Sequence, residues 1–187
     1  MNRHYNYKFE KDMVVIGPGE RFTTKDDIMI STVLGSCVAV TCFDTKLHVG
    51  GINHFMLPGD DLDSYSMGIT GRYGIHAMEL LFEDMRNLGC VMENIEIKVF
   101  GGGAVLKLNG EGSNSVPKNN INFTFRILKE KYKLPVAASD VGGEFGRKIL
   151  FFPQSGKVMV KLLNRSIISP VLRQEMQIIK ELRSDQK

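Results

Sequence analysis

The stretch MISTVLGSCVAVTCFDTKLHVGGINHFM, residues 29–56, decides the fold. It contains two apolar segments, Met29–Phe43 and Leu47–Met56, both rich in Val, Ile and Thr. The polar tripeptide 44–46 separates them. Short apolar runs of β-branched residues with a polar break between them are typical of two adjacent strands. The sequence therefore predicts a β-hairpin over 29–56.

The rest of the chain alternates helix-like and strand-like segments without a repeat. Two stripes have helical spacing, Ile75, Met78, Leu81, Phe82, Met85 and Leu88, then Ile121, Phe125, Leu128 and Tyr132. Strands are expected at 95–99, 136–139, 148–152 and 158–163, and polar loops at 58–71 and 109–120. A third helix is expected to begin at Ser169–Pro170, with Leu172, Met176 and Ile179 on one face. The sum is an α/β (α+β) fold, a single layered domain in which helices cover a mixed β-sheet.

Length and charge restrict the class of protein. A chain of 187 residues corresponds to one domain at roughly 100–200 residues per domain, and it is large enough for one continuous core. Lys plus Arg exceed Asp plus Glu by 24 − 21 = 3, too weak a field to indicate nucleic acid as a partner. Because no apolar stretch reaches the roughly 20 residues that cross a bilayer, no membrane insertion is expected.

The amino-terminal residues and the cysteines indicate the compartment. A secretion signal would need an apolar run where this chain has Arg3, Lys8, Glu10, Lys11 and Asp12. Three cysteines, an odd number without paired spacing, fit a reducing environment. We therefore expect a cytoplasmic protein, with His4 in a mobile amino terminus.

The hairpin brings a thiol and an imidazole into proximity. In an antiparallel pair the residue numbers of opposed residues have a constant sum. If Phe43 pairs with His48 across the turn, this sum is 43 + 48 = 91, so the residue opposite Cys37 is 91 − 37 = 54, which is His54. Directly opposed residues have Cβ atoms about 4.5–5.5 Å apart. A slip of one residue would place Asn53 there instead and turn His54 to the other face.

A Cys–His pair is a chemically productive combination. The thiolate is the nucleophile, and a nearby imidazolium lowers the pKa of the thiol. Gly35 and Ser36, directly before Cys37, supply backbone N–H groups that could hold a developing oxyanion. The alternative is that Cys37 is an ordinary core cysteine, since Cys is among the most buried residue types.

Other patterns in the chain are weaker. Cys37, Cys42, His48 and His54 resemble a set of zinc ligands, but Cys37 and Cys42 are an odd number of residues apart and should face opposite sides of a strand. Cys42 and Cys90 are therefore interpreted as core residues and His76 as structural. The glycine clusters 101–103 and 142–143 lack the spacing of nucleotide-binding loops and are interpreted as tight turns.

Four separated motifs resemble the signature of the chemoreceptor glutamine deamidase CheD family. They are Leu34–Val40, Gly50–Pro58, Phe100–Ala104, and Asp140–Gly143 with Gly146–Lys148, and the likeness covers roughly 14–163. The resemblance implies one CheD-like deamidase domain over 1–187, with a core at about 14–163 and a helical extension at about 169–183. It also implies a fold similar to the catalytic domain of cytotoxic necrotizing factor toxins.

The resemblance further implies the chemistry and the partners. Cys37 and His54 match the nucleophile and base of a Cys–His–Thr constellation that converts receptor glutamines to glutamate and releases ammonia, without a metal or organic cofactor. Both Ser31 and Thr32 could supply the third member, and we expect Thr32. The expected partners are receptor cytoplasmic helices and the chemotaxis phosphatase CheC. The extension could bind a partner or pack on its own domain.

Two other functions are compatible with these residues. The chain could be a non-catalytic adapter that binds chemoreceptors or CheC. It could also be a general cysteine peptidase or amidase, which would cleave backbone peptide bonds.

Overall fold

The computed structural model describes residues 1–56, 69–105 and 115–184, which form two five-stranded sheets and three α-helices. The first sheet has the order β1-β2-β4-β9-β10, with strands Asn2–Asn6, Lys11–Val15, Met29–Leu34, Gly146–Phe152 and Lys157–Leu163. The second has the order β3-β6-β5-β7-β8, with strands Arg21–Thr24, Val49–Phe55, Val38–Asp44, Ile95–Gly101 and Val136–Val141. The helices are α1 (Ile69–Asn87), α2 (Ser115–Glu130) and α3 (Arg165–Ser184), and Met92–Asn94 form a 3₁₀ turn.

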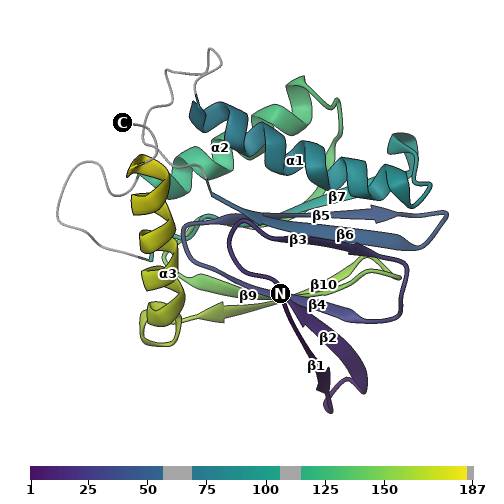
Figure 1. Cartoon of the computed structure of the whole chain (residues 1–187), viewed down its shortest axis with the longest axis horizontal. Helices are drawn as coiled ribbons and strands as arrows, with labels where there is room; N and C mark the ends of the chain where they lie inside the picture. The colour runs from purple at the N-terminus through teal and green to yellow at the C-terminus, as the bar shows by residue number, and fades with distance from the viewer. Residues whose placement is uncertain (57–68, 106–114, 185–187) are drawn as a thin grey trace.

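The elements are stacked in three layers (Figure 1). The two sheets lie face to face, and α1 and α2 cover the other face of the second sheet. Each sheet is mixed, because β2 pairs with β4 and β7 with β8 in parallel while the other pairs are antiparallel. The expected α+β class is confirmed, but the single sheet that we expected is two sheets.

Two apolar cores follow from this layering. The inter-sheet core contains residues of both sheets, among them Ile30, Ile149 and Phe151 from the first and Ala39, Ile52 and Phe100 from the second. The helix-side core joins the second sheet to α1 and α2, and includes Val38, Val40, Cys42, Phe82, Met85 and Leu128. A strand covered on both faces needs apolar residues at every position. This explains why five of the seven residues of β5 are apolar, Val38, Ala39, Val40, Cys42 and Phe43.

The segment 29–43 is two strands rather than one. β4 belongs to the first sheet and β5 to the second, so the chain crosses between the sheets at Gly35, Ser36 and Cys37. The hairpin itself is confirmed as β5–β6. A pattern of apolar residues could not predict the crossing, because both strands are buried and the three residues between them are small.

The remaining expectations differ from the structure mainly at the ends of elements. The helix around Met78–Met85 and strands β7 to β10 are confirmed. α2 begins at Ser115, inside the expected loop 109–120, and α3 begins at Arg165 with Pro170 inside it. His4 lies in β1, where it pairs with Met13 of β2, instead of lying in a mobile terminus. Most of the expected loop 58–71 lies outside the described residues, and the likeness to the toxin domain stays a prediction.

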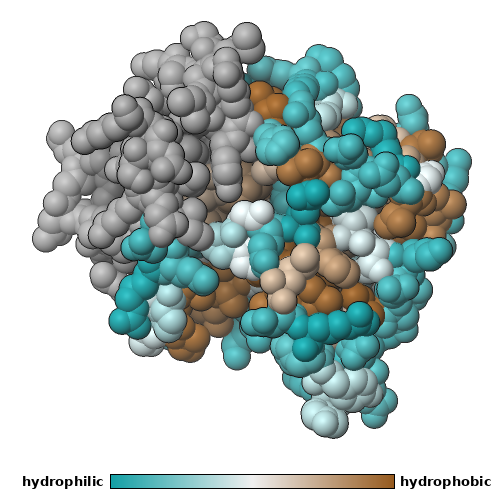
Figure 2. All heavy atoms as spheres, in the orientation of Figure 1, coloured by the Kyte–Doolittle hydropathy of each residue, from teal (hydrophilic) through white to brown (hydrophobic). Residues whose placement is uncertain are grey.

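The surface shown in Figure 2 mixes hydrophilic residues with smaller apolar areas over the described elements. In that part of the chain, none of the helices combines the length and the apolar character that a membrane span requires.

Candidate active site

Cys37 lies in the crossing between the two sheets, and the backbone of this crossing is fixed by hydrogen bonds. Its three carbonyl groups accept from three donors: Gly35 from the N–H of Gly103 (2.8 Å), Ser36 from the side-chain amide of Asn120 (2.8 Å) and Cys37 from the N–H of Gly102 (2.7 Å). The glycine cluster 101–103 therefore supports the cysteine loop. The N–H groups of Gly35 and Ser36 are left for other acceptors.

Gly101 shows why this cluster must be glycine. Its φ is +110°, and a Cβ atom there would lie 2.3 Å from the carbonyl oxygen of Cys37. Such a separation is far inside van der Waals contact, and L-residues rarely adopt this φ. The expectation of a tight backbone turn at 101–103 is confirmed, and the turn directly positions the cysteine.

The hairpin register differs from the expected one by two residues. Phe43 lies opposite Gly50, not His48, so His54 faces Ala39. His48 instead sits in the turn with a φ of +55°, and its N–H donates to the carbonyl of Asp44. Because side chains alternate along a strand, an even shift keeps His54 on the face we expected. The Sγ of Cys37, a ring nitrogen of His54 and a carboxylate oxygen of Glu175 all lie within 4.8 Å of one another.

Thr32, in β4 of the opposite sheet, contacts the imidazole of His54. Its Oγ1 lies 2.8 Å from His54 Nδ1 and donates its own proton to the carbonyl of Ile16 at 2.9 Å. A hydroxyl has one proton, so towards His54 this oxygen acts as an acceptor. Nδ1 therefore carries the imidazole proton, and Nε2 has the free lone pair. Ser31 precedes Thr32 in the strand and points to the opposite face.

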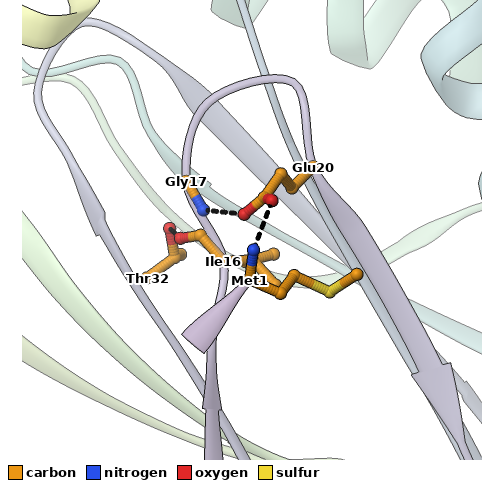
Figure 3. A network of polar contacts seen from close by, with 5 residues as sticks. All are labelled: Met1, Ile16, Gly17, Glu20 and Thr32. Atoms are coloured by element: carbon orange, nitrogen blue, oxygen red, sulfur yellow. Dashed lines mark hydrogen bonds and ion pairs between the residues drawn. The ribbon is translucent and has the colours of Figure 1, made fainter. Parts of the chain in front are cut away.

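The backbone of His54 is held by hydrogen bonds to the segment 19–20. The N–H of His54 donates to the carbonyl of Glu20 (2.9 Å), and the N–H of Gly19 donates to the carbonyl of His54 (2.8 Å). The Glu20 carboxylate accepts from the N–H of Gly17 (2.8 Å) and from the amino group of Met1 (2.7 Å), next to Ile16 and Thr32 (Figure 3). No sequence motif indicated a role for this segment.

Glu175, which no sequence motif indicated, reaches the cysteine loop from α3. Its carboxylate accepts from the N–H of Gly35 (2.9 Å), the N–H of Ser36 (3.0 Å) and the hydroxyl of Ser36 (2.8 Å). The side chain is buried. A charged residue three positions after Leu172, on the apolar face of an amphipathic helix, was the signal that could have drawn attention to it.

Burial determines the protonation state of the cysteine and the histidine. Burial raises the pKa of the Cys37 thiol well above its usual value, and the neighbouring Glu175 carboxylate raises it further. Burial lowers the pKa of His54 to about 4, although the carboxylates of Glu175 and Glu20 oppose this shift. At neutral pH both groups are therefore uncharged in this conformation, a thiol beside a neutral imidazole.

The fold separates Cys42 and His48 from Cys37 and His54, so the four residues that resembled a zinc set do not meet. Cys42 and Cys90 pack in the helix-side core, as expected, while Cys37 faces the inter-sheet core and His48 lies at the surface. His76 lies on α1 and is exposed. Cys37, His54 and Glu175 do offer a thiol, an imidazole and a carboxylate, which Zn²⁺ accepts as ligands. Both oxygens of Glu175 already accept hydrogen bonds, from the N–H of Gly35 and from the N–H and hydroxyl of Ser36.

The comparisons with known proteins agree with one another. Residues 56–162 match the family described as CheD chemotactic sensory transduction. The chain is 41% identical over 175 residues, 93% of its own length and 84% of the relative's, to a "Probable chemoreceptor glutamine deamidase CheD 1" of Shewanella oneidensis. A protein of the same name from Dechloromonas aromatica is 43% identical (88% and 80% covered), and a "Probable chemoreceptor glutamine deamidase CheD" of Janthinobacterium is 40% identical (98% and 89%).

Among solved structures, the Bacillus licheniformis hypothetical protein YfiH aligns with a TM-score of 0.38 and 14% identity, over 64% of this chain and 49% of that one. The matched family segment begins two residues after His54, so it identifies the chain independently of Cys37 and His54. Together with the relatives, which align over most of their length, this match establishes that the chain belongs to the CheD family.

Proposed function

We propose that this protein hydrolyses the side-chain amide of selected glutamines on chemoreceptor cytoplasmic helices, giving glutamate and ammonia. The observation that carries the proposal is the Thr32–His54 contact, which leaves Nε2 with the free lone pair of an imidazole that has a ring nitrogen within 4.8 Å of the Cys37 sulfur. The names of the relatives support the same substrate.

The first half of the reaction forms an acyl-enzyme. Nε2 of His54 takes the thiol proton, and the Sγ of Cys37 attacks the amide carbon of the glutamine. The carbonyl oxygen becomes an oxyanion that the N–H groups of Gly35 and Ser36 stabilise. The C–N bond then breaks as His54 returns the proton to the leaving nitrogen, so ammonia departs and a thioester remains.

The second half releases the product. His54 takes a proton from water, the resulting hydroxide attacks the thioester carbon, and the C–S bond breaks. The sulfur recovers a proton from His54, and a glutamate side chain is released. Throughout the cycle Thr32 holds Nδ1, so that Nε2 always faces the reacting atoms. The mechanism uses no metal or organic cofactor.

One observation favours the adapter alternative: Cys37 and His54 are 0% and 1% exposed, so the thiol is closed to substrate in this conformation. Ammonia release from a receptor cytoplasmic fragment discriminates the two functions. The deamidase should add about one dalton per converted glutamine, and Cys37→Ala should abolish this gain because the nucleophile is lost. Cys42→Ala, which removes a buried thiol from the other face of β5, is the matched control and should retain activity.

Failure of the wild-type protein to modify its cognate receptor, while still binding it, would leave only the adapter function. A peptidase would fragment the receptor, whereas a deamidase leaves a band of unchanged size on a gel. Binding of CheC is a separate prediction, which a pull-down with the purified phosphatase tests.

A further inference from the structure

The Glu175 carboxylate occupies the position that the proposed reaction assigns to an acyl group. It bridges the two backbone N–H groups of Gly35 and Ser36, and it lies within 4.8 Å of the Cys37 sulfur and a His54 nitrogen. It is also a glutamate side chain carried by a helix, which is the chemical form of the product that the reaction releases from a receptor helix.

We propose that the Gly35–Ser36 backbone is a binding site for a helix-borne glutamate side chain, and that α3 fills it with Glu175 as an internal product mimic. This inference rests on the proposed function. The receptor helix must then displace α3 before its glutamine can reach Cys37.

The hydrogen bonds of the site fit a carboxylate better than an amide. Oε1 accepts from one donor and Oε2 from two, so both oxygens act only as acceptors. An amide in the same pose would direct its NH₂ group at a backbone N–H, because it has one oxygen rather than two. The pose of Glu175 is therefore that of a product and not of a bound substrate.

The packing of α3 is specific but separate from the main cores. Ile168 and Leu172 are fully or almost fully buried against Val105, Val33 and Val171, in a cluster distinct from the inter-sheet and helix-side cores. Gly35 makes the close approach feasible, since a Cβ atom there would lie 2.6 Å from Leu172 Cδ2 and 2.9 Å from Glu175 Oε2. Figure 1 shows α3 standing beside the two sheets rather than between layers. It can therefore leave without opening either sheet.

The first test measures access to Cys37 without any receptor. In Glu175→Ala, α3 loses its anchor and Cys37 loses the carboxylate that raises its pKa, so we expect alkylation of Cys37 by iodoacetamide to accelerate roughly tenfold or more, since hydrogen bonds to a charged group are the stronger kind. Leu172→Ala loosens α3 but keeps the carboxylate, and it should also accelerate alkylation; an acceleration confined to Glu175→Ala would come from the thiol pKa alone and would overturn the α3 site. Arg173→Ala removes an exposed side chain of the same helix and should leave the rate unchanged. Tandem mass spectrometry separates Cys37 from Cys42, and an unchanged melting transition in circular dichroism shows that the variant is folded.

The second test uses the enzyme as its own substrate. In Glu175→Gln the side chain must turn so that its single oxygen faces the two N–H groups, which presents the amide carbon to Cys37, so the chain should gain about one dalton at that residue during incubation, through thioester formation and hydrolysis as above. An amide that persists at position 175 in a variant that still deamidates the receptor would overturn the α3 site. The double variant Cys37→Ala/Glu175→Gln should keep its amide.

The outcomes separate the inference from the proposed function. Faster alkylation of Glu175→Ala without deamidation by any variant supports the α3 site and removes the enzyme. Receptor deamidation by the wild type, with equal alkylation rates in the wild type and Glu175→Ala, overturns the α3 site and leaves the enzyme. Faster alkylation together with faster receptor deamidation in Glu175→Ala supports both.

Discussion

The hydroxyl of Thr32 accepts a hydrogen bond from Nδ1–H of His54, because its own O–H donates to the carbonyl of Ile16. This contact joins the two sheets, since Thr32 lies in β4 of the first and His54 in β6 of the second. The tautomer of the proposed base therefore depends on how the sheets pack against each other.

Thr32→Val should lower kcat for ammonia release by about 10- to 100-fold, because the imidazole loses the acceptor that fixes its tautomer and position. The KM for the receptor fragment should change little, since Thr32 is buried and does not touch substrate. Thr32→Ser keeps the hydroxyl and is the matched control. A Thr32→Ser variant as slow as Thr32→Val would show that the methyl group, and not the hydroxyl, is what matters.

His54 should make folding stability depend on pH in the acid range. Burial lowers its pKa to about 4 in the folded protein, from an ordinary value of 6.5. Between these values the unfolded chain binds a proton that the folded chain does not, so the free energy of unfolding falls as the pH falls from 6.5 towards 4. The slope from this group is at most about 1.4 kcal/mol per pH unit. Well above pH 6.5 His54 is neutral in both the folded and the unfolded chain, so it no longer makes the free energy of unfolding depend on pH.

Urea unfolding of the wild type and His54→Gln at several pH values between 4 and 7 measures this slope. The variant should lose stability less steeply with acid than the wild type does. Parallel curves for the wild type and His54→Gln would contradict the burial effect on the His54 pKa.

The sequence predicted the partners in the site better than their geometry. The register was wrong because Asp44 accepts hydrogen bonds from the N–H groups of Lys46 and Leu47 at 2.9 Å each, which makes the turn four residues long. Local composition does not encode that length unambiguously. The error was even, so Cys37 and His54 stayed on one face, as alternation requires.

Glu175 could not be predicted in the same way. It lies 140 residues from Gly35 along the chain, and only the packing of α3 brings the two together. The crossing between the sheets was equally hidden, because β4 and β5 are both buried and read as one strand. Periodicity therefore identifies the elements, whereas long-range packing decides which residues meet.

Asp140 and Arg147 should matter more to stability than an ordinary surface ion pair. Arg147, in β9 of the first sheet, has a side chain only 5% exposed, and its Nε and Nη2 donate to Asp140 in β8 of the second sheet at 3.0 and 2.8 Å. Asp140→Asn leaves this guanidinium buried without its carboxylate. We expect a loss of about 2 kcal/mol in the free energy of unfolding, less than for a fully buried pair because Asp140 is partly exposed.

The matched control is Asp12→Asn, which breaks the Arg3–Asp12 pair, in which both side chains are about half exposed. Its cost should be within about 0.5 kcal/mol, because solvent screens exposed pairs. Equal losses in the two variants would mean that Arg147 does not need its partner between the sheets.

Gly101→Ala should damage both stability and activity, and Gly143→Ala separates the causes. Both glycines have a positive φ, +110° and +71°. The Cβ at Gly143 would meet nothing within 4 Å, so that substitution costs only backbone strain, about 1 kcal/mol. At Gly101 the Cβ would collide with the Cys37 carbonyl, which adds an overpacking cost and brings the loss to about 3 kcal/mol.

Because the collision pushes the cysteine loop itself, ammonia release should also fall in Gly101→Ala at temperatures where the protein is still folded. If both variants lost equal stability and kept full activity, the glycine cluster would not be what positions Cys37.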